Sequence, residues 1–144
     1  MGHELDVQRL IDAPVDTVFR SRIDLDTERE ISRMYNPTAD ISGEVRVGAN
    51  RIIAWGTEDK RCRVTQTFLE IGVNRVVYSE LLEVPPSPVY VSTITETMQP
   101  QGERTLFQFH VEGFPTAEER DMHSEGYNIV LDRLQGYLAS VRGS

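Results

Sequence analysis

The chain has 144 residues, and this length predicts a single domain over residues 1–144 with one hydrophobic core. Its 15 Lys and Arg residues against 23 Asp and Glu residues give a formal net charge of −8, which disfavours nucleic acid and anionic membrane surfaces as partners. The sequence shows no apolar run long enough to span a bilayer and no secretory signal. With its single cysteine, it predicts a cytoplasmic protein without an internal disulfide.

The first part of the chain predicts one strand followed by two short helices. Residues 4–11 alternate apolar and polar side chains, as a strand does. Pro14 then precedes an apolar stripe with helical spacing, which predicts a helix start. A second helix is expected over residues 24–34, with Asp26 as its cap, and it ends before Pro37.

From residue 38 the pattern changes to strands separated by turn residues. Pro100-Gln101-Gly102 lies between two long alternating runs and predicts a hairpin. The prolines at 85–88 form a connection that cannot join a sheet. The sequence therefore predicts six consecutive strands, within residues 39–48, 51–57, 60–71, 75–84, 89–98 and 104–114.

The last part of the chain predicts one long helix over residues 116–141. Thr116 with Glu119 three residues later is typical of a capped helix start. Gly126 and Gly136 interrupt this helix, and we expect Gly126 to let a strand or a ligand approach it closely. Its apolar stripe consists of Tyr127, Leu131, Leu134, Leu138 and Val141, widened by Ile129, Val130 and Tyr137.

Three stretches together resemble the START/SRPBCC helix-grip superfamily, and in particular the homologues of the activator of the heat-shock-protein-90 ATPase, which are related to polyketide cyclases. They are VQRLIDAPVDTVF at the start, VYVSTITETMQPQGERTLFQFHVEGF in the late strands, and GYNIVLDRLQGYL in the last helix, where Tyr127 stands in place of a usual Trp. The resemblance implies an α+β helix-grip fold. In this fold a curved seven-stranded antiparallel sheet wraps around the long C-terminal helix, two short helices lie between strands 1 and 2, and a hydrophobic cavity separates sheet and helix.

No pattern of metal or nucleophile chemistry appears in the sequence. The histidines are far apart, and we expect His110 and His123 at the surface rather than at a metal. Cys62 has no histidine at a recognisable spacing, and neither a nucleophile elbow nor a phosphate-binding loop is present. The sequence therefore predicts no metal site and no cofactor.

Acid–base chemistry has better candidates. Glu80 and Glu96 fall among apolar strand residues, and a carboxylate inside an apolar cavity would have a raised pKa and could act as a general acid or base. Gln66 and Arg51 could orient a ligand there by hydrogen bonds. A register shift of one residue would move all four to solvent, and the solvated face is the interpretation that we favour.

The cavity is expected to be lined mainly by aromatic residues, of which Trp55, Tyr78, Phe109 and Tyr127 are the best candidates. A buried Tyr127 hydroxyl would need a polar partner from the protein or from a ligand. The full predicted set is Trp55, Phe68, Tyr78, Glu80, Glu96, Met98, Phe107, Phe109 and Tyr127.

Three functions follow as hypotheses. The leading one is a cytoplasmic domain that binds a small hydrophobic or amphipathic ligand. The second is a cofactor-free cyclase or hydrolase acting on a polyketide-like substrate, with Glu80 or Glu96 as the acid or base. The third, which the resemblance implies, is an interaction module that stimulates a chaperone ATPase. A homodimer is compatible with the exposed edges of such a sheet.

Overall fold

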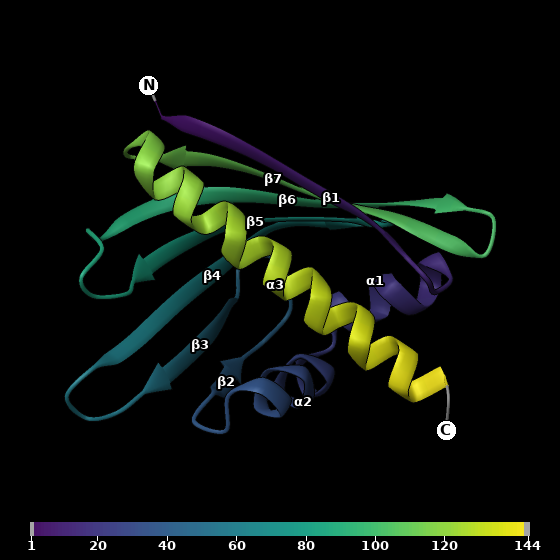
Figure 1. Cartoon of the computed structure of the whole chain (residues 1–144), viewed down its shortest axis with the longest axis horizontal. Coiled ribbons are helices and arrows are strands. Elements are labelled where there is room, and N and C mark those ends of the chain that lie inside the picture. The colour runs from purple at the N-terminus through teal and green to yellow at the C-terminus, as the bar shows by residue number, and fades with distance from the viewer. Residues whose placement is uncertain (1, 143–144) are drawn as a thin grey trace.

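A computed structural model describes residues 2–142 of the chain. It confirms the helix-grip architecture, in which a curved seven-stranded antiparallel sheet faces a long C-terminal helix (Figure 1). The elements in chain order are β1 (His3–Ile11), α1 (Val15–Ile23), α2 (Leu25–Tyr35), β2 (Asp40–Gly43), β3 (Asn50–Gly56), β4 (Arg61–Gly72), β5 (Arg75–Glu83), β6 (Tyr90–Gln101), β7 (Arg104–Phe114) and α3 (Ala117–Arg142).

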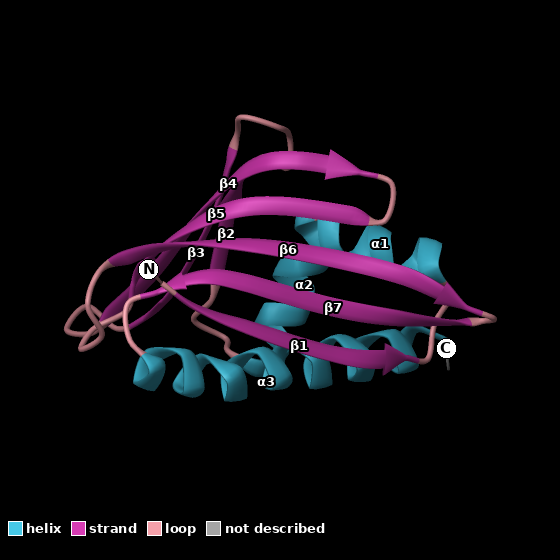
Figure 2. Ribbon diagram, turned by 90° about the horizontal axis from the view of Figure 1, so that it is seen from above, coloured by secondary structure: helices cyan, strands magenta, loops and turns pink. Residues whose placement is uncertain are grey.

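The strand order β1-β7-β6-β5-β4-β3-β2 brings the first strand beside the last. Strands β2 to β7 form a meander of neighbours, so β1 and β2 are the two edges of the sheet. Seen from above, α3 runs beside β1 along the length of the sheet (Figure 2). Within the described residues, no helix is long and apolar enough to cross a membrane.

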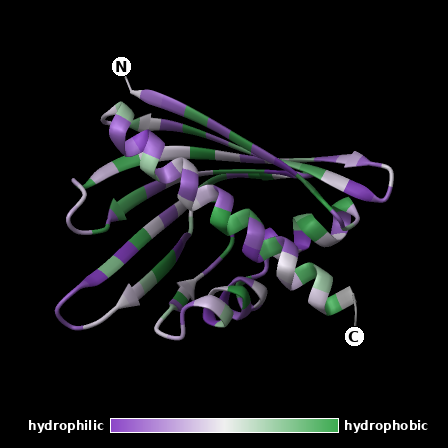
Figure 3. Ribbon diagram, in the orientation of Figure 1, coloured by the Kyte–Doolittle hydropathy of each residue, from purple (hydrophilic) through white to green (hydrophobic). Residues whose placement is uncertain are grey.

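The core forms where the alternating strands meet the stripe of α3. Figure 3 shows hydrophobic and hydrophilic residues alternating along the strands, as expected for a sheet with one buried face. The helix contributes Leu131, Leu134 and Leu138, as its spacing predicts. Ile129 is an exception with 43% exposure, because it lies two residues from Leu131 and a helix turns about 200° over that step. Val141, in the last turn of α3, is also exposed.

Two predicted details at the start of the sheet are wrong. Strand β2 ends at Gly43 instead of continuing to residue 48, because the chain turns there with a φ of 103° that favours glycine. A Cβ atom at this position would lie 2.1 Å from the Asn50 carbonyl oxygen. The cap of α2 is Asp24, which accepts a hydrogen bond of 2.6 Å from the Thr27 hydroxyl, rather than Asp26. Both differences move an element boundary and leave the topology unchanged.

Polar contacts hold α3 at its start and in its middle. The Thr116 hydroxyl accepts a hydrogen bond of 3.1 Å from the Glu119 amide, which confirms the predicted cap. In the middle of the helix, Arg9 on β1 forms an ion pair with Asp132 and donates to the Asn128 side chain. The contacts of Arg9 tie the middle of α3 to the edge strand β1.

Replacing Gly126 with Ala should stabilise the protein by about 0.5–1 kcal/mol, because alanine loses less backbone entropy in a helix. A Cβ atom at Gly126 would meet no atom within 4 Å. At Gly136 the same atom would lie 3.1 Å from the Tyr35 hydroxyl, so Gly136→Ala should gain less. Urea unfolding of the two variants measures both effects, and a destabilised Gly126→Ala would contradict the prediction.

Candidate functional site

A pocket of about 430 Å³ lies between α2, α3 and the inner face of β3, β4 and β5. Its volume is within the range of small-molecule sites. The wall combines aliphatic and aromatic side chains with a group of charged ones. The apolar part consists of Ala39, Ile53, Trp55, Val64, Leu82, Val84, Phe109 and Val130, and the polar part includes Arg22, Glu28, Arg51, Gln66, Glu80 and Arg133.

The structure separates the predicted cavity residues into two groups. Trp55, Tyr78, Glu80, Phe109 and Tyr127 line the pocket. The remaining four lie outside its wall and pack in the core: Phe68, Glu96, Met98 and Phe107. Ligand contact by the first group stays a prediction.

A buried ion pair stands beside the pocket. The Arg22 guanidinium donates to both oxygens of Glu96, from Nε at 2.8 Å and from Nη2 at 3.0 Å. The Tyr78 hydroxyl donates to the same carboxylate at 2.5 Å, and Glu28 lies 3.3 Å from Arg22. Burial alone would raise the pKa of Glu96, but the charge and hydrogen bonds of Arg22 hold it below its usual value.

A second polar group crosses three strands. Arg51, Gln66 and Glu80 are direct cross-strand partners on β3, β4 and β5, so the register places them in one row. Arg51 Nε donates to Gln66 Oε1 at 2.7 Å, and Gln66 Nε2 donates to Glu80 Oε1 at 2.8 Å. Burial raises the pKa of Glu80 from its ordinary 4.5 to about 6, and the hydrogen bond from Gln66 opposes this rise.

The favoured interpretation of these residues as solvated is therefore wrong. The exposed fraction is 1% for Arg51, 5% for Gln66, 8% for Glu80 and 1% for Glu96. All four occupy inward positions of their strands, because each strand keeps its alternation without a register shift at these positions.

Arg51 is enclosed by groups that leave it little contact with the pocket. Its Nη1 donates to the main-chain carbonyl of Arg22 at 3.1 Å, which links the two polar groups. Its guanidinium lies over the ring of Phe68 at 5.1 Å and near that of Tyr78 at 5.9 Å. An amide oxygen, a carbonyl oxygen and two rings therefore stabilise the cation in a site with almost no access to water.

Sequence reasoning missed Arg22, although a signal was present. Arg22 follows Val15 and Val18 at steps of three and four residues, so it lies on the apolar stripe of its helix. A charged residue on such a stripe is rarely buried unless it is paired. That position could have indicated a buried partner, but not which carboxylate on the distant strands supplies it.

Tyr127 lies on the pocket wall with its ring centroid 4.8 Å from that of Phe109. Within residues 2–142 its hydroxyl makes no hydrogen bond, so the expected polar partner does not come from the described protein. Burial raises the pKa of this phenol, and the nearby carboxylates of Glu80 and Glu96 add to the rise. The hydroxyl is thus a neutral group available to the pocket.

His123 is more enclosed than the sequence suggests. Its imidazole lies 5.5 Å from the Phe114 ring and 3.2 Å from the Glu119 carboxylate, and its side chain is 24% exposed. It lines the pocket near the start of α3 and is half-buried, so it is less exposed than expected. The cause is the packing of the first turns of α3 against the ends of β6 and β7, as the contacts with Tyr90 and Phe114 show.

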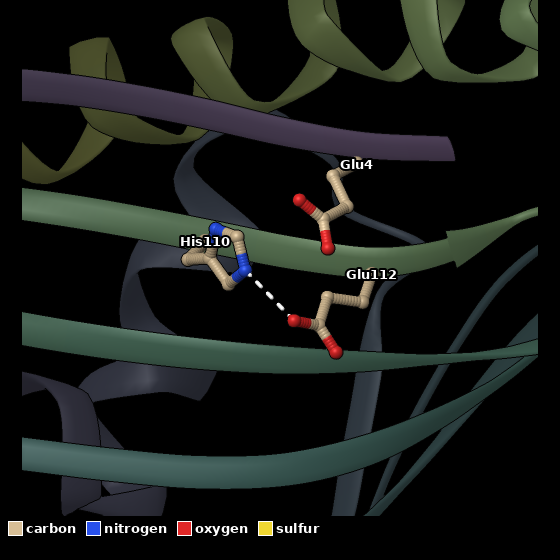
Figure 4. A group of neighbouring side chains, drawn as sticks. All are labelled: Glu4, His110 and Glu112. Atoms are coloured by element: carbon tan, nitrogen blue, oxygen red, sulfur yellow. Dashed lines mark hydrogen bonds and ion pairs between the residues drawn. The ribbon is translucent and has the colours of Figure 1, made fainter. Parts of the chain in front are cut away.

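A separate cluster lies on the outer face of the sheet, where β1 pairs with β7. Glu4, His110 and Glu112 offer potential metal-ligand atoms within 4.8 Å of one another (Figure 4). Each imidazole nitrogen of His110 already contacts a carboxylate, Asp6 at 2.8 Å and Glu112 at 3.0 Å. These hydrogen bonds raise the pKa of His110, because a protonated imidazole can donate to both carboxylates.

Comparison with known protein families gives a match over most of the chain. The family model described as "Activator of Hsp90 ATPase homolog 1-like protein" matches residues 12–139. No curated protein matches the sequence.

Several solved structures are similar to this chain. The Mll3558 protein from Rhizobium loti has 23% identity and a TM-score of 0.82, over 94% of this chain and 96% of that chain. Ara h 8.0201 has 12% identity and a TM-score of 0.79, over 97% and 99%. DynU16, described as a protein in the dynemicin biosynthetic locus, has 17% identity and a TM-score of 0.73, over 94% of this chain and 47% of that chain. At these identities the likeness establishes a shared helix-grip fold.

Replacing Arg22 with Met should destabilise the protein by about 3–5 kcal/mol, because it leaves the Glu96 carboxylate buried without its cation. A matched control is Arg63→Met, which breaks the exposed Arg63–Glu83 pair of 2.9 Å and should cost at most about 1 kcal/mol. Guanidinium unfolding of both variants gives the comparison. Equal small losses would mean that the buried pair adds nothing to stability.

Replacing Glu80 with Gln should change how stability depends on pH. A raised folded-state pKa means that Glu80 stabilises the fold below about pH 4.5 and that this contribution is lost as the pH rises through about 6. The shift corresponds to about 2 kcal/mol. The stability of Glu80→Gln relative to wild type should therefore increase by about 2 kcal/mol between about pH 4 and about pH 7.5, as measured by urea unfolding. A difference independent of pH would contradict the raised pKa.

Proposed function

We propose that this chain, which belongs to the family of activator of Hsp90 ATPase homolog 1-like proteins, binds a small hydrophobic or amphipathic molecule in the pocket between its sheet and α3. The observation that carries the proposal is a pocket of about 430 Å³ whose wall is largely apolar but includes a buried row of polar side chains. Apolar walls with a few placed polar groups are typical of small-molecule sites.

Aromatic rings line the pocket from several sides, which also suits ligand binding. Trp55, Phe109 and Tyr127 reach it from β3, β7 and α3, so rings surround the space from different directions. The presence of DynU16 in a biosynthetic locus supports a small molecule as the class of ligand for this fold.

A thermal-shift screen with lipids, sterols, flavonoids and polyketides, followed by native mass spectrometry, tests the proposal. Trp55 is the single tryptophan of the sequence and lines the pocket, so its fluorescence should change when a ligand enters. The proposal requires a ligand-dependent rise in melting temperature together with this change. The absence of both for every apolar class would overturn it.

Replacing Val130 with Phe should weaken ligand binding at least about tenfold, because the larger side chain occupies part of the pocket. The matched control is Ile129→Phe, one residue earlier on the same helix and exposed to solvent. Titrations followed by Trp55 fluorescence compare the two affinities. If both variants bind as wild type does, the ligand does not occupy this pocket.

A second function, cofactor-free acid–base catalysis, is favoured by the state of Glu80. This carboxylate is buried, faces the pocket and has a pKa of about 6, which suits proton transfer near neutral pH. Glu96 is unsuited to the role, since Arg22 and Tyr78 already occupy it. The candidate reaction is the cyclisation or hydrolysis of a polyketide-like substrate, with Glu80 as the base.

Replacing Glu80 with Gln should lower kcat on such a substrate by a factor of about 10²–10⁴, the usual contribution of a general base. The control is Glu83→Gln on the same strand, where the side chain pairs with the exposed Arg63. Turnover of a synthetic polyketone, followed by mass spectrometry, supplies the measurement. Equal rates for wild type and Glu80→Gln would remove Glu80 from the reaction.

The family description suggests a third function, stimulation of the Hsp90 ATPase. We rank it behind the other two, because the site described above fits a small molecule. An ATPase assay of the chaperone with and without this chain distinguishes it, and stimulation that Val130→Phe leaves unchanged would favour a surface outside the pocket.

A further inference from the structure

We infer that the pocket selects an uncharged ligand whose hydroxyl, an alcohol or a phenol, donates a hydrogen bond to Glu80 and contacts the hydroxyl of Tyr127. This inference rests on the proposed function and adds the chemical class of the ligand. It follows from which polar atoms of the pocket already have partners and which do not.

The row across the strands engages both polar atoms of the Gln66 amide. Its oxygen accepts from Arg51 and its nitrogen donates to Glu80 Oε1. Among the described residues, Glu80 Oε2 receives no hydrogen bond. The side chain of Glu80 nevertheless lies on the pocket wall with only 8% exposure.

The free oxygen of Glu80 is not sealed inside the core. In the described part of the chain, the polar side-chain atoms that are both fully buried and unpaired belong to Ser92 and Gln135. Glu80 Oε2 and the Tyr127 hydroxyl are unpaired but remain accessible from the pocket. A ligand that fills the pocket would remove water from both, so it must supply hydrogen bonds in exchange.

The groups nearest the free oxygen of Glu80 favour a neutral donor over an anion. Arg133, on the α3 side of the wall, is engaged with the Tyr35 ring, whose centroid lies 4.9 Å from its guanidinium. A ligand carboxylate would meet the carboxylate of Glu80, while the cation of Arg51 is 1% exposed and held by Gln66, the Arg22 carbonyl and two rings. An ionised Glu80 is an acceptor only, and an acceptor in a low-dielectric site repels a second one strongly.

The same surroundings disfavour a cationic ligand. Arg22 and Arg133 both line the pocket, and a ligand ammonium would also lose its hydration against an apolar wall. A hydroxyl avoids both penalties. It can donate to Glu80 and share a hydrogen bond with Tyr127, whose hydroxyl acts as donor or acceptor.

The test compares three matched probes, naphthol, methoxynaphthalene and naphthoate, by isothermal titration calorimetry at neutral pH. We expect naphthol to bind about tenfold or more tightly than either of the others, as a hydrogen bond to a charged group implies. Equal binding of naphthol and its ether, or tighter binding of naphthoate, would overturn this inference and leave the proposed function standing. Failure of all three to bind would overturn this inference alone, because the proposed function is tested by the wider screen of apolar classes.

Two variants test which side chains of the pocket cause the preference for naphthol. Glu80→Gln should weaken naphthol about tenfold and strengthen naphthoate, because it removes the negative charge and places an amide donor in the pocket. Tyr127→Phe should weaken naphthol about threefold and leave methoxynaphthalene unchanged. Glu83→Gln, on the outer side of the same strand, is the control and should bind all probes as wild type does. Unchanged probe preference in both pocket variants would overturn the assignment.

Discussion

The ion pair between Arg22 and Glu96 is the contact on which the pocket depends. Arg22 lies near the end of α1, Glu96 lies on β6, and the same guanidinium reaches Glu28 on α2. One side chain therefore positions both short helices over the sheet. Because neither charge can lose its partner without a large penalty, the helices have one favoured position, and the space between them and α3 is defined by it.

This pair also explains how a pocket can persist in a small domain. Apolar side chains tend to close any void between packed layers, because a void forfeits dispersion contacts. Here the side of the space nearest α1 is built from charged groups that are held by directed hydrogen bonds, including the Arg51 contact to the Arg22 carbonyl. Directed bonds fix distances that close packing alone would shorten.

Most of the fold, but only part of this site, could be predicted from the sequence. Alternation along the strands and the three-and-four spacing of α3 depend on local residues, so the elements and the inward positions of Phe107, Phe109 and Leu131 could be predicted. The partnership of Arg22 with Glu96 joins residues 74 positions apart, and no local pattern contains that information. The row from Arg51 to Glu80 required the exact pairing of three strands, which a shift of one residue would have reversed.

The two buried carboxylates differ in how far the protein itself supplies their hydrogen-bond partners. Glu96 accepts from Arg22 and Tyr78, and its oxygens are occupied within the protein. Glu80 receives one hydrogen bond from an uncharged amide, has no cation paired with it among the described residues, and has a raised pKa. A group that raises the energy of the folded state at neutral pH adds nothing to the stability of the fold there. Its presence on the pocket wall, next to the unpaired hydroxyl of Tyr127, is therefore better explained by what enters the pocket than by what holds the protein together.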